Sequence, residues 1–120
     1  MLFRSEMPKY LVSRLIEEFG ALKGKKVLVI GVSYKPDVAD TRETPASSLF
    51  DQLIRDNAEV YWHDPLVENW KENKISKLSD EIFDLTIVQV LHDSIDLKSI
   101  KDNSKVIFDC TGKISGVAHL

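Results

Sequence analysis

One stretch of the chain predicts its architecture: residues 26–45, which read KVLVIGVSYKPDVADTRETP. The apolar run Lys26–Ile30 is typical of a buried strand in a parallel sheet. Thr44 and Pro45 can begin a helix, because threonine caps helix N-termini and proline is tolerated at the first helical position. A loop between such a strand and such a helix lies at the carboxyl edge of the sheet, where open α/β folds bind ligands. Residues 31–44 are therefore the first candidate for a ligand-binding loop.

This loop differs from a dinucleotide-binding turn. Ser33 and Pro36 stand where the second and third glycines of the Gly-x-Gly-x-x-Gly fingerprint would be. The loop instead carries an aromatic ring and four charged side chains: Tyr34, Lys35, Asp37, Arg42 and Glu43. A lysine point charge and a forked guanidinium suit a pyrophosphate or a ribose phosphate. The alternative is a surface loop held by its own salt bridges, which contribute little to stability.

The remainder of the chain alternates predicted strands and helices. Apolar, β-rich runs predict strands at 59–62, 85–91 and 105–108, and apolar residues at helical spacing predict a helix from Pro45 to about Asn57. Asp93 or Ser94 is expected to cap a short helix that continues through Leu97 and Ile100. The polar segment 66–84 is expected to be irregular, with short helices near Trp70 and at 79–83.

Such alternation indicates an α/β, three-layer Rossmann-like domain with a mostly parallel sheet and right-handed crossovers. Reversal of the chain after the second strand predicts the strand order 2-1-3-4. The loop after Gly31 and the pair His92-Asp93 would then face the same crevice, at the point where the winding direction changes.

One long amphipathic helix is expected at the N-terminus, over residues 6–22, before the first strand. Two interpretations remain open. The helix packs on the chain's own sheet, or it continues into a region upstream. In the second case the stripe of Leu11, Leu15 and Phe19 would be an oligomer contact or poorly covered.

Size and composition exclude several classes. With 120 residues, 43% of them hydrophobic, the chain suits one compact domain. Charged residues make up 29% and the net charge is −3, so no basic surface for nucleic acid is expected. Cys110 is the single cysteine, which indicates a reducing compartment. No apolar run approaches the roughly 20 residues of a membrane span. We expect a cytoplasmic protein that binds neither nucleic acid nor membrane.

Other polar residues have both a functional and a structural interpretation. Asp64 follows the second strand, where an acidic residue can bind a ribose hydroxyl, but Asp-Pro is also an ordinary turn. His63 and His92 lie far apart in the sequence and have too few carboxylate or thiol neighbours to indicate a metal site, so no metal is expected. His92-Asp93 is either an acid–base pair or a strand exit with a helix cap. Cys110 is expected to be a buried or half-buried thiol, because nothing in the sequence places a base beside it or lowers its pKa.

Residues 24–45 closely resemble the start of the C-terminal domain of the UDP-glucose/GDP-mannose dehydrogenase family. The pieces that carry the resemblance are Tyr-Lys-Pro-Asp at 34–37 and Asp-Thr-Arg-Glu at 40–43, at this spacing. Further matches cover essentially the whole chain: Met7-Pro8, Asp64-Pro65, His92 and Asp109.

The resemblance implies a role in an NAD-dependent oxidoreductase that oxidises C6 of a UDP-sugar to the uronic acid for polysaccharide precursors. Residues 24–120 would be the nucleotide-sugar-binding domain, and residues 1–23 would connect it to a central dimerisation region, giving a homo-oligomer. Tyr34 and Lys35 would contact the nucleotide sugar and Arg42 would contact NAD. The NAD fingerprint and the catalytic cysteine belong to segments that this chain lacks, so NAD would bind mainly elsewhere. No catalytic residue is assigned to these 120 residues, and alone they should be inactive.

One departure from the family pattern affects the active site. Many relatives carry an arginine after the fourth strand that reaches the neighbouring subunit's substrate, and Thr111 stands at that position here. Lys113 is a candidate replacement. The sugar and the base of the nucleotide stay open, and two rival interpretations remain: a free-standing nucleotide-binding module and a purely structural dimerisation domain.

Overall fold

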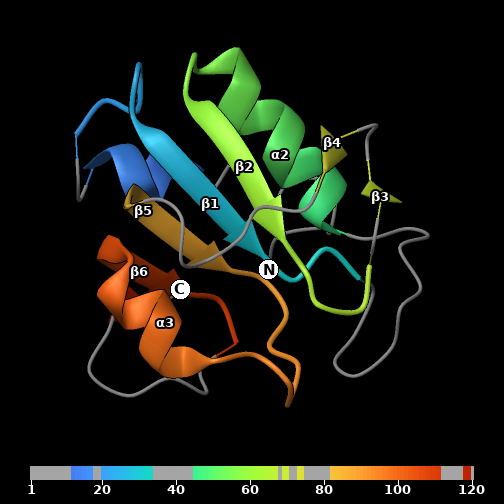
Figure 1. Cartoon of the computed structure of the whole chain (residues 1–120). Coiled ribbons are helices and arrows are strands. Elements are labelled where there is room, and N and C mark those ends of the chain that lie inside the picture. Colours follow the sequence, from blue (N-terminus) through green and yellow to red (C-terminus); the bar gives the residue numbers. More distant parts are fainter. Residues whose placement is uncertain are drawn as a thin grey trace.

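The computed structural model describes residues 12–17, 20–33, 45–67, 69–70, 73–74, 82–111 and 118–119. Its centre is a five-stranded parallel sheet in the order β2-β1-β5-β6-β7 (Figure 1). The strands are β1 (Lys26–Ile30), β2 (Glu59–His63), β5 (Phe83–Val88), β6 (Ser104–Asp109) and β7 (Ala118–His119). The predicted parallel sheet and the predicted order of its first four strands are confirmed. The short edge strand β7 was not predicted.

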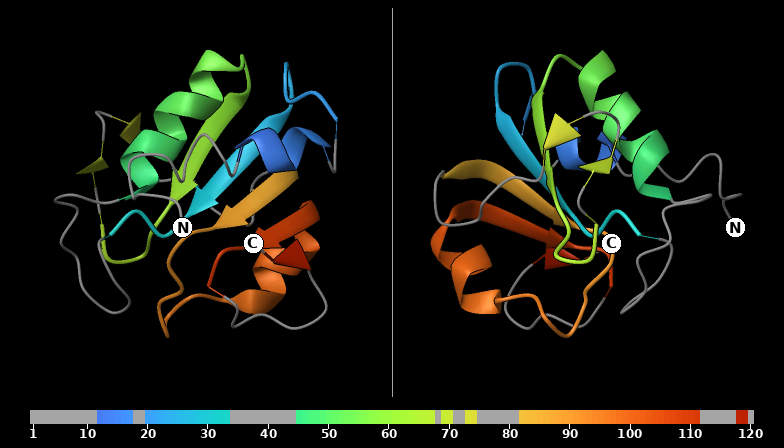
Figure 2. Two further views of the ribbon diagram at one scale, coloured as in Figure 1. Left: turned by 180° about the vertical axis from the view of Figure 1, so that it is seen from behind. Right: turned by 45° about the vertical axis from the view of Figure 1, so that its right-hand side comes forward.

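Helices cover both faces of the sheet. Residues 12–17 are helical and lie with α2 (Pro45–Arg55) on one face, whereas α3 (Leu97–Asp102) lies on the other (Figures 1 and 2). Alternate residues of β1 enter separate cores, Val27 and Val29 on the α2 side and Leu28 and Ile30 on the α3 side. Burial on both faces explains why β1 is an uninterrupted apolar run.

The register of the strands aligns their carboxyl ends. Ile30, the last residue of β1, pairs with His63 at the end of β2 and with Val88 at the end of β5. The segments that follow these three strands therefore leave the sheet side by side, at one edge. The chain winds from β1 to β2 in one direction and from β5 to β6 in the other, so the winding direction changes between β1 and β5.

The single long helix predicted over residues 6–22 is wrong. In the described part, residues 12–17 are helical, and the N–H of Gly20 donates to the carbonyl of Ile16 at 2.9 Å. Gly20 has a φ of +86°, a left-handed conformation that commonly ends a helix. Leu22 is buried but lies beyond this end. Residues 6–11 and 18–19 lie outside the described residues.

Leu15 follows the first of the two interpretations, packing on the chain's own sheet, and is not poorly covered. Leu15 and Val12 are buried and belong to the core cluster between the sheet and α2, together with Leu49 and Leu53. The helical segment 12–17 therefore packs on the chain's own sheet. Leu11 and Phe19, the other members of the predicted stripe, lie outside the described residues.

The segment 66–84 departs from the prediction as well. In place of a helix near Trp70, β3 (Asn69–Trp70) and β4 (Asn73–Lys74) pair as a short antiparallel hairpin. Asn73 and Lys74 offer no apolar continuation of a helical face, which removes the burial that stabilises a short helix. Phe83 begins β5, so the helix predicted at 79–83 cannot include it; residues 75–81 lie outside the described part.

The end of β5 and the cap of α3 also differ from the prediction. Strand β5 ends at Val88, whereas the predicted strand continued to Leu91. The strand ends there because the N–H groups of Gln89 and Val90 both donate to the carbonyl of Ile30. The cap of α3 is Asp96, not Asp93 or Ser94. Its Oδ1 accepts the N–H groups of Lys98 and Ser99 at 3.1 and 3.3 Å.

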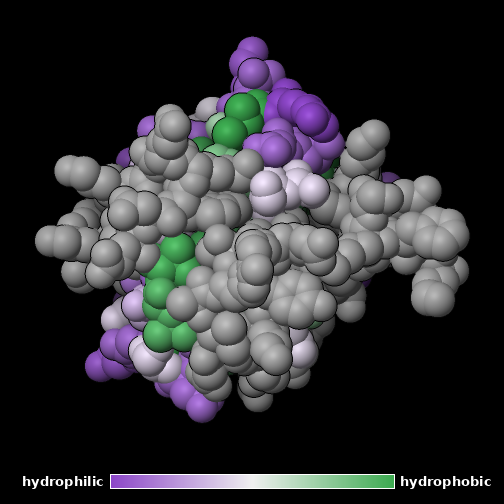
Figure 3. Space-filling model, turned by 90° about the vertical axis from the view of Figure 1, so that its right-hand side faces the viewer, coloured by the Kyte–Doolittle hydropathy of each residue, from purple (hydrophilic) through white to green (hydrophobic). Residues whose placement is uncertain are grey.

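The described surface mixes polar and apolar side chains. The large apolar residues that stay exposed come from different parts of the chain: Ile16, Ile54, Leu66, Ile82 and Leu97. On the face seen in Figure 3, the described apolar side chains form small groups, and hydrophilic side chains lie beside part of each group. Within the described residues, no helix has both the length and the apolar character needed to cross a bilayer.

Candidate functional site

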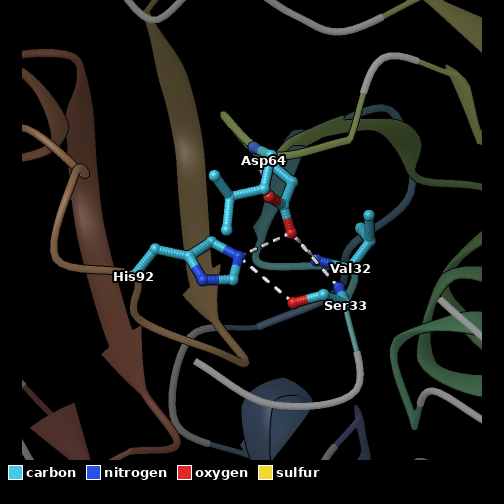
Figure 4. A network of polar contacts seen from close by, with 5 residues as sticks. Val32, Ser33, Asp64 and His92 are labelled. Carbon is cyan, nitrogen blue, oxygen red and sulfur yellow. Dashed lines mark hydrogen bonds and ion pairs between the residues drawn. The ribbon is translucent and has the colours of Figure 1, made fainter. Parts of the chain in front are cut away.

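Three polar side chains meet at the carboxyl edge of the sheet, and each follows a different strand. Ser33 follows β1, Asp64 follows β2 and His92 follows β5 (Figure 4). Their relative exposures are 0%, 0% and 1%. Buried polar groups at this density are costly unless they are hydrogen-bonded to one another, so the geometry of their contacts decides what they do.

Asp64 is the centre of this network. Its Oδ2 accepts the backbone N–H groups of Val32 and Ser33 at 3.0 and 3.2 Å, and it lies 2.9 Å from Nε2 of His92. Its Oδ1 accepts the N–H of Leu66 at 2.9 Å. Four donors thus surround a fully buried carboxylate and offset the cost of removing it from water.

The contacts of His92 determine which ring nitrogen carries a proton. An ionised carboxylate can only accept, so Nε2 must donate to Oδ2 of Asp64. Ser33 Oγ lies 3.1 Å from the same nitrogen and can share that N–H. The imidazole is therefore held by two strand ends at once, and its Nε2–H is committed to the protein rather than to a ligand.

Gly31 allows the main chain to leave β1 closely against the segment after β5. Its φ is +84°, and its N–H donates to the carbonyl of His63 at 2.9 Å. A Cβ at this position would lie 2.1 Å from the carbonyl oxygen of Val90. Only glycine fits both this backbone conformation and the space beside Val90, so the conformation in which the main chain leaves β1 is sterically determined.

The predicted ligand residues lie just beyond this point. Tyr34, Lys35 and Arg42 fall within 34–44, outside the described residues. The residue that precedes them, Ser33, contacts His92, which confirms that the start of this loop meets the segment after β5. Asp93, the second member of the predicted pair, is exposed.

Asp64 forms the predicted turn, because its Oδ1 accepts the N–H two residues later. Its other oxygen has three donors within the protein, which disfavours the alternative role as a ribose ligand. Sequence reasoning missed the pairing of Asp64 with His92. The available signal was positional: both residues directly follow strands that the predicted order places at the same edge, next to β1.

A second polar turn follows β6. Oδ1 of the buried Asp109 accepts the N–H and the hydroxyl of Thr111 at 2.8 and 2.6 Å. Burial, aided by the negative charge of Asp109, raises the pKa of the Cys110 thiol to about 12. Cys110 is half-buried, as expected. Lys113 lies outside the described residues.

A shallow hollow of about 170 Å³ adjoins the network on the α3 side. It is lined by Leu91, His92, Asp93, Ile95 and Leu97. Its small size does not suit a nucleotide. Among the residues that the structure describes, no three His, Cys, Asp or Glu side chains are grouped as a metal site would need.

Comparison with known proteins identifies one family. The sequence profile described as the UDP-glucose/GDP-mannose dehydrogenase family, UDP binding domain, matches residues 28–115. A UDP-N-acetyl-D-mannosamine dehydrogenase of Methanococcus aeolicus is 34% identical over 98 residues, which are 80% of this chain and 22% of that protein. A UDP-glucose 6-dehydrogenase of Oryza sativa is 44% identical over 57 residues, 47% of this chain and 12% of that protein.

Solved structures agree with the sequence matches. The UDP-N-acetyl-mannosamine dehydrogenase of Staphylococcus aureus superposes with a TM-score of 0.75 at 29% identity, over 95% of this chain and 30% of that one. This chain therefore corresponds to less than a third of each of these relatives.

Proposed function

Since this chain belongs to the UDP-glucose/GDP-mannose dehydrogenase family and matches its UDP-binding domain, we propose that it is the nucleotide-sugar-binding part of an NAD-dependent 6-dehydrogenase. The substrate class is a UDP-sugar with a primary alcohol at C6, and the product is the uronic acid. The free-standing module and the purely structural domain are not favoured, because the relatives are named as dehydrogenases of UDP-sugars.

The match of residues 28–115 to the UDP-binding domain is the observation that carries this proposal. The contact between Ser33 and His92 at 3.1 Å supports the location of the site. It lies between the ends of β1 and β5, where the winding of the sheet reverses and open α/β folds bind their ligands. The loop 34–44 starts from this point. Tyr34 and Lys35 are proposed to contact the nucleotide sugar, with the lysine ammonium beside the diphosphate, and Arg42 is proposed to contact NAD.

NAD, when bound by the enzyme, would supply the hydride acceptor for the oxidation at C6. The described edge of the sheet lacks the fingerprint glycines, so it does not fit the dinucleotide diphosphate, and we propose that NAD is bound mainly by other parts of the enzyme. The role of this domain is to bind and orient the substrate and to limit water at the closed site.

We extend the proposal to the organisation of the whole enzyme. Residues 1–23 connect this domain to a dimerisation region, and the enzyme acts as a homo-oligomer in the cytoplasm. A single cysteine is consistent with a reducing compartment. This part of the proposal rests on the family, and sedimentation of the full-length protein tests it.

Direct binding to the 120-residue chain tests the nucleotide site. Titration with UDP, followed by calorimetry and by amide chemical shifts, should show saturable binding. Lys35→Ala should weaken it by roughly 10- to 150-fold, the effect of one lost charge-assisted hydrogen bond. Lys105→Ala is the matched control: Lys105 is 67% exposed and pairs with Asp84 at the amino edge of the sheet. An equal loss in both variants would mean general electrostatics and not a site.

Steady-state kinetics of the full-length enzyme test the residue assignments. Lys35→Ala should raise KM for the UDP-sugar, and Arg42→Ala should raise KM for NAD, each by the same order of magnitude. The isolated chain should form no NADH with either substrate. Equal effects of both variants on both substrates would contradict the assignments, and NADH formation by the isolated chain would contradict the division of roles.

A further inference from the structure

The buried carboxylate of Asp64 occupies a position that is normally available to a ligand. In dinucleotide-binding folds, backbone N–H groups in the turn after the first strand point at the ligand's diphosphate. Here the first N–H groups of that kind, those of Val32 and Ser33, both donate to Oδ2 of Asp64. The chain supplies its own anion where such a fold would accept a phosphate.

We propose that Asp64, held by His92, acts as an internal anion that holds the main chain at Val32 and Ser33 and excludes phosphate from the end of β1. The diphosphate of the nucleotide sugar is then bound away from these two N–H groups. This inference rests on the proposed function and adds a specificity-determining pair to it. The carboxylate itself touches no ligand; it acts through the main chain at 32–33.

Electrostatics support the exclusion. A diphosphate placed against the N–H groups of Val32 and Ser33 would lie within a few ångströms of a carboxylate that is 0% exposed. Like charges at such a separation repel strongly where water does not screen them. A dinucleotide diphosphate is therefore rejected at this edge, whereas a ligand whose phosphates lie beyond Ser33 is accepted.

His92 makes this arrangement rigid. Its Nε2–H is the one side-chain donor to Oδ2 among the contacts in Figure 4, and the same nitrogen lies 3.1 Å from Ser33 Oγ. The pair thus joins the ends of β1, β2 and β5 through one buried group. The main chain from Gly31 to Ser33 is therefore held by this junction and by the conformation of Gly31.

The chain contains a matched control for Asp64. Oδ2 of Asp84 accepts the N–H of Lys26 at 2.9 Å, so Asp84 also binds a backbone N–H of β1, but at the opposite edge of the sheet. Asp64→Asn and Asp84→Asn make the same chemical change at the two ends of one strand. In Asp64→Asn the amide NH₂ must face either the N–H of Leu66 or the donors on Oδ2, so at least one donor loses its partner.

The experiment compares these variants of the full 120-residue chain by amide chemical shifts without ligand and by UDP titration. Asp64→Asn should shift the amides of Val32 and Ser33, and weaken UDP binding on the order of tenfold, which is about 1.4 kcal/mol. Asp84→Asn should change UDP affinity less than about twofold, within the effect of a surface charge. Both affinities are measured where unfolding curves show each variant folded.

The His92 variants test whether the pair acts as a unit. His92→Gln can still offer an N–H to Asp64 and should keep most of the wild-type affinity for UDP. His92→Leu should lose as much UDP affinity as Asp64→Asn does. If His92→Leu does not fold, the comparison of Asp64→Asn with His92→Gln still decides, because the first lacks the anion and the second keeps it.

Three results would overturn the inference. These are an unchanged ligand-free spectrum of Val32 and Ser33 in Asp64→Asn, an unchanged UDP affinity in that variant, and equal losses in Asp64→Asn and Asp84→Asn. If the wild-type chain binds no UDP, the proposed function fails instead. In that case the ligand-free spectra alone support or overturn the positioning role.

Discussion

Replacing Gly31 with alanine should lower the free energy of unfolding by about 2–5 kcal/mol. The first contribution is conformational: at a φ of +84°, an L-residue costs about 1–2 kcal/mol relative to glycine. The second is steric. The new Cβ would lie 2.1 Å from the carbonyl oxygen of Val90 and 2.7 Å from its carbonyl carbon and Cβ. Relieving such an overlap requires movement of the main chain, and overpacking of this kind typically costs about 1–3 kcal/mol.

Gly24→Ala and Gly20→Ala separate the two contributions. Gly24 and Gly20 have φ values of +75° and +86°, but an added Cβ would meet nothing within 4 Å at either position. Each control should therefore lose only the conformational part, about 1–2 kcal/mol. The difference between Gly31→Ala and the controls measures the clash with Val90.

Urea unfolding, followed by tryptophan fluorescence to which the buried Trp62 contributes, provides the measurement. Equal slopes against denaturant are required, so that the midpoints report stability alone. If Gly31→Ala is no less stable than Gly24→Ala within about 0.5 kcal/mol, the close approach to Val90 is not a constraint. The argument that this contact determines the exit of the ligand loop would then fail.

Further predictions concern three other parts of the molecule. Leu15→Ala should cost about 2–5 kcal/mol in the same unfolding assay, because Leu15 is 0% exposed; a loss below about 1 kcal/mol would mean that the first helix is peripheral. The N–H of Lys26 holds the pKa of Asp84 in the folded chain below its ordinary value of 3.8. The ionised carboxylate therefore stabilises the folded chain above that pH, and this stabilisation is lost as the pH falls through the lowered pKa of the folded chain. The stability difference between wild type and Asp84→Asn should thus be constant near neutrality and shrink in acid; a difference that does not change with pH would contradict this. With a pKa raised to about 12 by burial, Cys110 should react with a thiol reagent at pH 8 far more slowly in the folded chain than in urea, and equal rates would contradict its burial.

Local patterns were sufficient for much of the fold. The apolar run at 26–30 and the proline at 45 predicted β1 and the start of α2 correctly, because burial on both faces of a strand and the missing N–H of proline are properties of the residues themselves. The alternation of elements predicted the order β2-β1-β5-β6, since right-handed crossovers leave few ways to connect parallel strands. The family was also evident from the spacing of residues 34–43.

Predictions failed where the outcome depended on distant partners. The pairing of Asp64 with His92 joins residues 28 positions apart, and no local pattern distinguishes a turn-forming aspartate from one that is also buried against a histidine. Asp93, Ser94 and Asp96 are equally good caps by residue type, and the packing of α3 on the sheet selected Asp96.

The N-terminal segment shows the same division between local chemistry and tertiary contact. Its apolar spacing correctly indicated an amphipathic helix but not its end, because Gly20 is compatible with either a continued or a terminated helix until its φ is known. Whether Leu15 is covered depends on which surface lies opposite, and that surface is built by β1 and α2 from later in the chain. The residues carry their own polarity and conformational preferences, whereas burial and hydrogen-bond partners arise only when separate segments of the folded chain meet.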